Sequence, residues 1–125
     1  MSIAGLNYVS QLMNSLSIPY AFMRWNKKEI PEYYFVGEYD EVPTSTKEEN
    51  GYCETNFKLR GFTRKDWLLL EQAKAKIEAN ATKTAILGDG TGIAVFYESG
   101  MVIPTSDAEL KSIQITLRIK EWKVL

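Results

Sequence analysis

The chain has 125 residues, of which 45% are hydrophobic and 25% are charged, and its formal net charge is −1. These values are typical of one globular domain and exclude a disordered or collagen-like chain. A net charge so close to zero gives no general attraction to nucleic acid or anionic lipid. We therefore predict a single domain over residues 1–125 that binds no specific nucleic-acid sequence. No segment approaches the roughly 18 apolar residues of a membrane helix, so no membrane association is expected.

Histidine is absent from the chain, and Cys53 is its one cysteine. The lack of histidine excludes Ser-His-Asp and Cys-His mechanisms and most transition-metal sites. One cysteine cannot form an internal disulfide or a cysteine-based zinc site. We therefore predict that the protein is not an enzyme, with no catalytic residues, metal ligands or cofactor. The N-terminus does not resemble a signal peptide, so folding in the cytoplasm is expected.

The first quarter of the chain is predicted to contain a helix followed by a short extended segment. Apolar residues at helical spacing predict an amphipathic helix over about residues 3–16. These residues are Leu6, Val9, Met13 and Leu16. Pro19 prevents the helix from continuing. The apolar and aromatic run from Tyr20 to Trp25 is consistent with a strand or an extended lead-in.

Two long strands with a polar loop between them are predicted next. They cover Tyr33–Val42 and Tyr52–Phe62, and they flank the acidic loop of residues 43–51. Apolar and polar residues alternate in the second strand. This alternation places Cys53 on the inward face, where we expect it to be a small core residue.

A second helix and three further strands are predicted in the remaining half. Thr63 with Asp66 three residues later indicates a capping box, so the helix is expected over Thr63–Asn80, with Trp67 on its apolar stripe. Gly92–Glu98 is a predicted strand that turns at Ser99 and Gly100. Met101–Pro104 then pairs back as a short partner strand.

The last strand, Leu110–Trp122, has the clearest alternation in the chain. Its predicted core residues are Ile113, Ile115, Leu117 and Ile119. Trp122 falls on the opposite face, where we expect it to reach a partner. The resulting fold class is α+β, with a mostly antiparallel sheet packed against two helices in the order α-β-β-α-β-β-β.

Two clusters suggest chemistry, and each has a plainer interpretation. Gly88–Gly92 is glycine-rich, but a strand rather than a helix follows it, which indicates a turn and not a phosphate loop. Glu38, Asp40 and Glu41, with Glu48 and Glu49, suggest a cation site or acid–base chemistry on a sugar. Their spacing does not match a calcium loop, so a solvated or partner-facing edge is the preferred interpretation.

Charge is distributed unevenly along the chain. Residues 29–54 contain eight acids and one base, Lys47, whereas residues 58–83 contain seven bases and three acids. Surfaces of opposite charge favour head-to-tail association of identical copies. The alternative is that both stretches are solvated faces.

The order and size of the elements resemble a known protein family. The resemblance lies in the aromatic strand Pro31-Glu-Tyr-Tyr-Phe-Val-Gly-Glu-Tyr, the alternating strand Tyr52–Phe62, the helix start Thr63-Arg-Lys-Asp-Trp-Leu, and the closing strand ending near Trp122. This pattern is similar to the tail terminator and tail-completion (head–tail joining) proteins of long-tailed bacteriophages and prophages.

That resemblance implies a non-enzymatic virion structural protein that forms a homo-oligomeric ring, commonly a hexamer. The implied partners are the tail tube protein and a head-completion protein, and the implied location is first the host cytoplasm and then the virion tail. We predict that the ring or tube interface contains Glu41, Thr44, Lys47, Glu48, Glu49 and Trp122. Two alternatives remain open. One is a bacterial adaptor or binding module that uses a sheet edge or the 42–50 loop. The other is a small enzyme that uses carboxylates such as Glu38 and Asp40.

Overall fold

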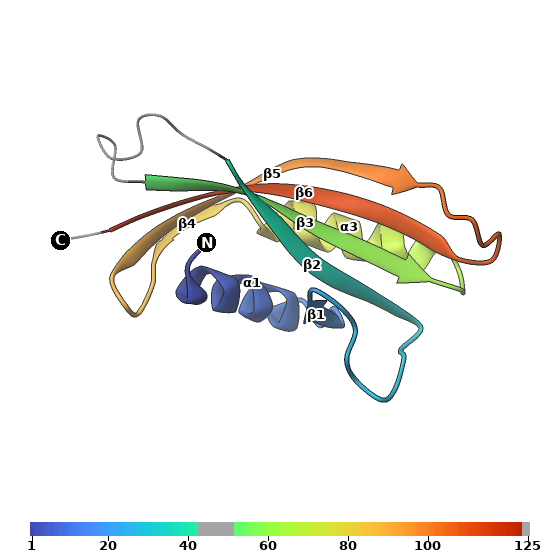
Figure 1. Cartoon of the computed structure of the whole chain (residues 1–125). Coiled ribbons are helices and arrows are strands. Elements are labelled where there is room, and N and C mark those ends of the chain that lie inside the picture. The colour runs from blue at the N-terminus through green and yellow to red at the C-terminus, as the bar shows by residue number, and fades with distance from the viewer. Residues whose placement is uncertain (43–51, 124–125) are drawn as a thin grey trace.

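The computed structural model describes residues 1–42 and 52–123, and it contains two helices and six strands in that part of the chain (Figure 1). In chain order the elements are α1 (Ile3–Ser15), β1 (Tyr20–Phe22), β2 (Tyr33–Val42), β3 (Tyr52–Thr63), α3 (Leu68–Asn80), β4 (Lys83–Ile86), β5 (Thr91–Ile103) and β6 (Lys111–Lys123).

The strands form one curled sheet in the order β1-β2-β3-β6-β5-β4. β1 is parallel to β2, and the other neighbouring strands are antiparallel. The sheet is therefore mixed, and the element order is α-β-β-β-α-β-β-β. The predicted fold class, a mostly antiparallel sheet in the order α-β-β-α-β-β-β, is wrong on both points.

The short strands β1 and β4 account for much of this error. β1 has three residues, which is too short for an alternating pattern to identify it. Its position is fixed by tertiary contacts, since the carbonyl of Pro19 accepts a hydrogen bond from the backbone N–H of Phe35 at 2.8 Å. β4 lies at the sheet edge with most of its side chains exposed, so it shows no apolar alternation.

The rest of the error lies in β5, which is one strand rather than two. Ser99 and Gly100 do not form a turn; a β-bulge lies between Tyr97 and Ser99, and the strand continues to Ile103. Gly100 is needed for close packing, because a Cβ there would lie 2.7 Å from Oη of Tyr97 and 2.8 Å from Cε of Lys74. A glycine that indicates a turn in the sequence is thus a site where α3 approaches the strand.

The second helix begins later than predicted. Thr63 ends β3, where its hydroxyl donates to the carbonyl of Glu32 at 2.7 Å and accepts from the backbone N–H of Lys65 at 3.0 Å. The helix starts at Leu68, with Trp67 at its N-cap position and no side-chain capping bond from that residue. The carboxylate of Asp66, one residue earlier, accepts from the backbone N–H of Leu68 at 2.9 Å. Trp67 precedes the helix and packs against the edge of the core.

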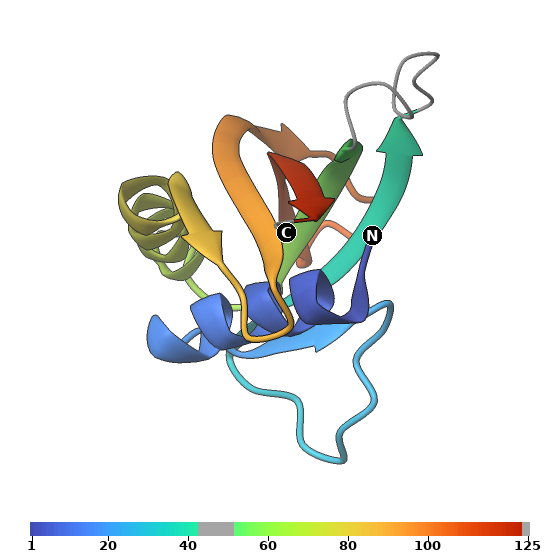
Figure 2. The same cartoon turned by 90° about the vertical axis from the view of Figure 1, so that its left-hand side faces the viewer.

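Both helices pack against the same face of the sheet, and this face holds the core (Figure 2). The fully buried side chains include Val9, Met13, Phe35, Phe57, Leu59, Leu70, Ile77, Ile113, Ile115, Leu117 and Ile119. The predicted inward face of the last strand is therefore confirmed. Cys53 follows the alternation of β3 but is exposed, so the prediction that it belongs to the core is wrong.

A buried carboxylate joins α1 to the end of the sheet. Glu121 continues the inward alternation of β6 and is 6% exposed. It accepts hydrogen bonds from the backbone N–H of Ser2, at 3.1 Å, and from the hydroxyl of Ser2. The same hydroxyl accepts from the N–H of Gly5 and caps α1. An acid at a helix N-terminus is favourable because unpaired N–H groups concentrate there.

Gly61 tests the packing between α3 and the sheet. A Cβ at this position would lie 2.6 Å from the ring of Phe35 and 3.1 Å from Leu70. We expect Gly61→Ala to lower the free energy of unfolding by about 1–3 kcal/mol, as overpacking does in tight cores. Denaturant unfolding measures the change. Gly88→Ala is the control, because a Cβ there meets no atom within 4 Å. Equal stability of the two variants would contradict the packing described.

Candidate functional site

The face of the sheet opposite the helices is a candidate surface. No described helix covers it (Figures 1 and 2). Its side chains come from alternate positions of β2, β3, β6 and β5, and most are half-buried beside one another. The polar members are Glu38, Asp40, Glu54, Asn56, Lys58, Arg60, Gln114, Thr116, Arg118 and Lys120. We call this surface the bare face.

Acids and bases on the bare face pair across neighbouring strands. The ion pairs are Arg60–Glu38 at 3.1 Å, Lys58–Asp40 at 3.3 Å and Lys120–Glu54 at 3.9 Å. The acidic and basic stretches of the sequence therefore lie side by side in space. Each such exposed pair contributes at most about 1 kcal/mol. The uneven charge along the chain does not become two surfaces of opposite charge here.

Glu38 and Asp40 lie on one strand face, as predicted, but their surroundings do not favour acid catalysis. Each carboxylate forms an ion pair with a cation of β3, and the side chain of Asp40 is 73% exposed. A general acid requires an apolar, poorly hydrated setting that keeps its proton on. The pair is better suited to holding β2 against β3.

Aromatic side chains cover one end of the bare face. The Trp25 ring lies 5.0 Å from that of Tyr34, which lies 5.5 Å from that of Phe62. The indole N–H of Trp25 donates to the carbonyl of Glu29, and Lys27 lies over the same ring. These contacts hold the connection between β1 and β2, which extends away from the sheet in Figure 1, against β2.

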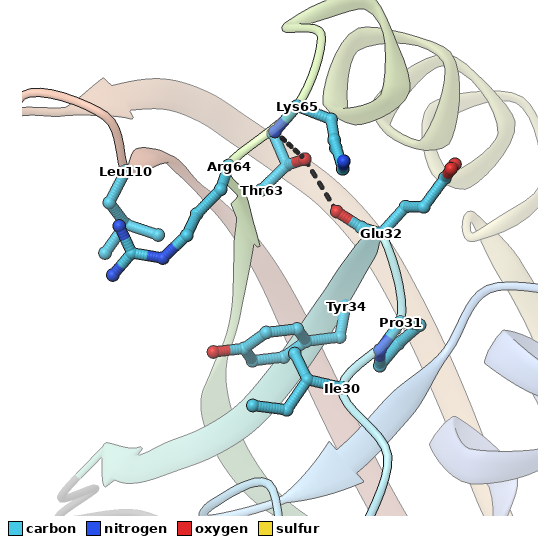
Figure 3. Close-up of a pocket in the computed structure, with 8 residues that line it drawn as sticks. All are labelled: Ile30, Pro31, Glu32, Tyr34, Thr63, Arg64, Lys65 and Leu110. Carbon is cyan, nitrogen blue, oxygen red and sulfur yellow. Dashed lines mark hydrogen bonds between the residues drawn. The ribbon is translucent and has the colours of Figure 1, made fainter.

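A hollow of about 390 Å³ lies beside this aromatic cluster (Figure 3). It is lined by Ile30, Pro31, Glu32, Tyr34, Thr63, Arg64, Lys65 and Leu110. The side chains of Tyr34 and Ile30 lie next to each other on one wall, and Arg64 lies close to Leu110 on another. The lining is suited to an apolar group, with cations at the rim.

The arginine at this rim already has a partner. Nη1 of Arg64 donates to the carboxylate of Asp107 at 2.7 Å. This hydrogen bond raises the pKa of Arg64 and lowers the pKa of Asp107. The ammonium group of Lys111 donates to the carbonyl of Lys65 at 2.9 Å. The hollow thus contains no nucleophile activated by a base, and we do not treat it as a catalytic site.

Trp122 lies at the other end of the bare face, on the side predicted from the alternation of β6. It is half-buried and pairs with Gly92 on β5. A Cβ at Gly92 would collide with the indole ring, so the ring lies directly against the glycine backbone. Asp89 and Gly90 form the turn that leads into β5, with the carboxylate of Asp89 accepting from the N–H of Thr91 at 3.0 Å. The predicted turn before a strand is confirmed for Gly88–Gly92.

The other predicted interface residues are only partly described. Glu41 lies near the end of β2, and its carboxylate pairs with the N-terminal amine of Met1. Thr44, Lys47, Glu48 and Glu49 lie outside the described residues. Glu41 and Trp122 both lie toward the end of the sheet where β2 finishes and β6 finishes, on opposite faces.

The edge of β5 is a feature that the sequence analysis missed. β4 pairs with Gly92–Val95 only, and the N–H of Tyr97 donates to the hydroxyl of Thr82 at 3.0 Å. Beyond Tyr97, no described strand pairs with this edge. Met101 and Val102 lie there on opposite faces and are 55% and 57% exposed. The signal is the unbroken apolar run Met101-Val102-Ile103, which the sequence predicts as part of a separate strand.

Two further observations concern the described residues. They contain no group of three or more His, Cys, Asp or Glu side chains placed to hold a metal ion. Neither α1 nor α3, the helices in this part of the chain, has the length and apolar character that spanning a bilayer demands.

Comparison with protein-family models gives no match, and comparison with curated proteins gives none either.

The contact between Trp122 and Gly92 can be tested directly. We expect Gly92→Ala to displace the indole ring and to lower the free energy of unfolding by about 1–3 kcal/mol through overpacking. The indole N–H resonance of Trp122, assigned with Trp122→Phe, should move in a two-dimensional ¹H–¹⁵N NMR spectrum. The resonances of Trp25 and Trp67 should stay in place. A spectrum with an unmoved Trp122 signal would show that the ring does not lie on Gly92.

Proposed function

We propose that this protein is a non-enzymatic phage structural protein, a tail terminator or tail-completion protein, which forms a ring at the tail end or head–tail junction. Its partners are further copies of itself, the tail tube protein and a head-completion protein. The proposal is supported by the resemblance in element order between residues 31 and 122 and by the surfaces that the fold leaves exposed.

The uncovered edge of β5 is the observation that carries this proposal. Sheet edges expose unpaired N–H and C=O groups that bind further strands, and monomeric proteins protect them with lysine, proline or a covering element. From Ser99 to Ile103 the strand itself has no lysine or proline, although the side chain of Lys74 on α3 lies against Gly100. Met101 and Val102 are more than half exposed. Such an edge is suited to a chain that works in an assembly.

The same observation supports a second candidate function. An adaptor or binding module can accept an extended peptide as an added strand at an open edge. The two functions differ in the partner, which is an identical chain in the first case and a foreign peptide in the second. The oligomeric state of the protein therefore separates them.

Native mass spectrometry of the wild type and of the Val102→Lys and Leu68→Lys variants tests the proposal. The wild type should form ring-sized oligomers, alone or with the tail tube protein, and electron microscopy should show them on tube ends. We expect Val102→Lys to raise the concentration needed for assembly by at least about tenfold, which corresponds to about 1.4 kcal/mol, since a charge on the edge disfavours strand pairing. Leu68→Lys is the matched control, because Leu68 is 59% exposed but lies on α3.

Two results would contradict the proposal. One is a wild-type chain that stays monomeric both alone and with the tube protein. The other is a gene neighbourhood without portal, capsid or tail-tube genes. If the Val102→Lys and Leu68→Lys variants assemble equally well, the β5 edge no longer supports the proposal.

A further inference from the structure

The direction of the backbone groups at the open edge of β5 follows from the residues before the bulge. The carbonyl of Thr91 accepts from the N–H of Leu87, which lies on the β4 side. The N–H of Tyr97 donates to the hydroxyl of Thr82 on the same side. Odd-numbered residues of β5 up to Tyr97 therefore turn their N–H and C=O groups away from β6. Even-numbered residues turn theirs toward β6, where their partners are also even-numbered.

The bulge reverses this order in the second half of the strand. Beyond it Ser99, Met101 and Ile103 pair with even-numbered residues of β6, so their backbone groups face β6. The N–H and C=O groups of Gly100 and Val102 therefore face away from the sheet. Among the described residues none bonds to these outward groups, and no strand lies beside them. The edge is thus open to a further antiparallel strand.

The β5 strand of a second copy can supply that strand, because a two-fold axis places two β5 edges antiparallel to each other. Outward groups must meet outward groups, which leaves few registers. Val102 opposite Val102 would put Gly100 against Pro104, which has no N–H to donate. Gly100 opposite Gly100 would put Val102 against Glu98, at the bulge. In the remaining register Gly100 of each copy exchanges both hydrogen bonds with Val102 of the other.

The side chains suit the register in which Gly100 lies opposite Val102. On the bare face, Met101 lies on the axis and meets Met101 of the second copy. Val102 is on the helix-covered side, because it pairs with Ile113, and it is more than half exposed in one copy. In the pair it lies beside Gly100, which has no side chain, and beside the stem of Lys74. The contact therefore covers both exposed apolar residues of the edge.

The charges beside the edge are self-complementary. Lys74 lies over Gly100, and the segment after α3 reaches Tyr97, so α3 runs antiparallel to β5. Glu71, about one turn before Lys74, lies nearer the end of β5. A two-fold axis at Met101 reverses this order in the second copy. Glu71 of one copy therefore comes toward Lys74 of the other, which favours the pair.

We propose that the free protein forms a two-fold dimer through its β5 edges, with Gly100 opposite Val102 and Met101 on the axis. The inference does not rest on the proposed function, because it concerns the chain before it meets any other partner. A two-fold contact closes after two copies, so the dimer is not itself a ring. It protects an edge that is open to unwanted strand pairing. A ring that uses the same edge forms only when the dimer opens.

Cysteine cross-linking tests the register. With the exposed Cys53 replaced by serine, Met101→Cys should give a disulfide dimer on mild oxidation, because facing Cβ atoms lie about 5 Å apart. Ser99→Cys is the matched control on the same face and edge. Two copies of residue 99 lie about 13 Å apart across the axis, so this chain should give no dimer by itself. Mixed with Ile103→Cys, which it faces, it should give a mixed dimer.

Amide hydrogen exchange tests the pairing in the wild type. The N–H groups of Gly100 and Val102 should exchange about tenfold more slowly at a concentration where about nine-tenths of the chain is dimeric than in the monomer. Analytical ultracentrifugation establishes the two concentrations. The N–H of Met101 faces β6 in both states, so its exchange should not change and it is the internal control.

Three results would overturn the inference. The first is a wild type that is monomeric at every concentration, and the second is equal cross-linking of the Met101→Cys and Ser99→Cys chains. The third is protection of Gly100 and Val102 only after the tail tube protein is added, without a dimer, which would show that the edge receives a strand of that protein. Tube capping is scored separately. A dimer without capping supports the contact and removes the proposed function, and capping without a dimer does the reverse.

Discussion

The strict alternation of β6 is the constraint on which the rest of the structure depends. Ile113, Ile115, Leu117 and Ile119 are at most 1% exposed, and β6 has a paired strand on each side along almost its whole length. A shift of one residue would turn all four outward, and each buried side chain of this kind contributes about 1.5–3 kcal/mol. The register of β6 therefore decides which face of the sheet receives the helices and which face stays bare.

The same alternation has a consequence at the end of the strand, where it brings an acid inward. Glu121 follows Ile119 on the core side, and a buried carboxylate is costly unless hydrogen bonds satisfy it. Ser2 supplies those bonds through its backbone N–H and its hydroxyl, and the same hydroxyl caps the first turn of α1, so the position of α1 depends on the end of β6. The next residue, Trp122, is turned to the bare face and lies on Gly92. One periodic pattern thus places both the carboxylate that anchors α1 and the half-buried Trp122.

The sequence predicts local patterns well and long-range pairing poorly. α1, β2, β3 and the inward face of β6 follow from periodicities that lie within one segment, and the structure contains each of them. β1 and β4 have three and four residues, and only their partners make them strands. Gly100 indicates a turn when its neighbours in sequence are considered. It proves to be a packing site once Lys74 of α3 lies against it. Thr63 likewise indicates a helix cap in the sequence, but it ends β3 and bonds to Glu32, far back in the chain.

The same distinction applies to the candidate site. Alternation within one strand predicts its two faces, but whether its edge is paired depends on other segments of the chain. Alternation alone locates the bare face and Trp122. The run of acids in β2 and the run of bases in β3 indicate separate charged surfaces, but antiparallel pairing brings Glu38 to Arg60 and Asp40 to Lys58 and cancels them. Whether a strand edge is covered depends on the length of its neighbour, which no pattern within that strand encodes. β1 and β4 are each shorter than the strand they cover. The association between copies that we propose therefore depends on unpaired backbone and apolar side chains more than on net charge.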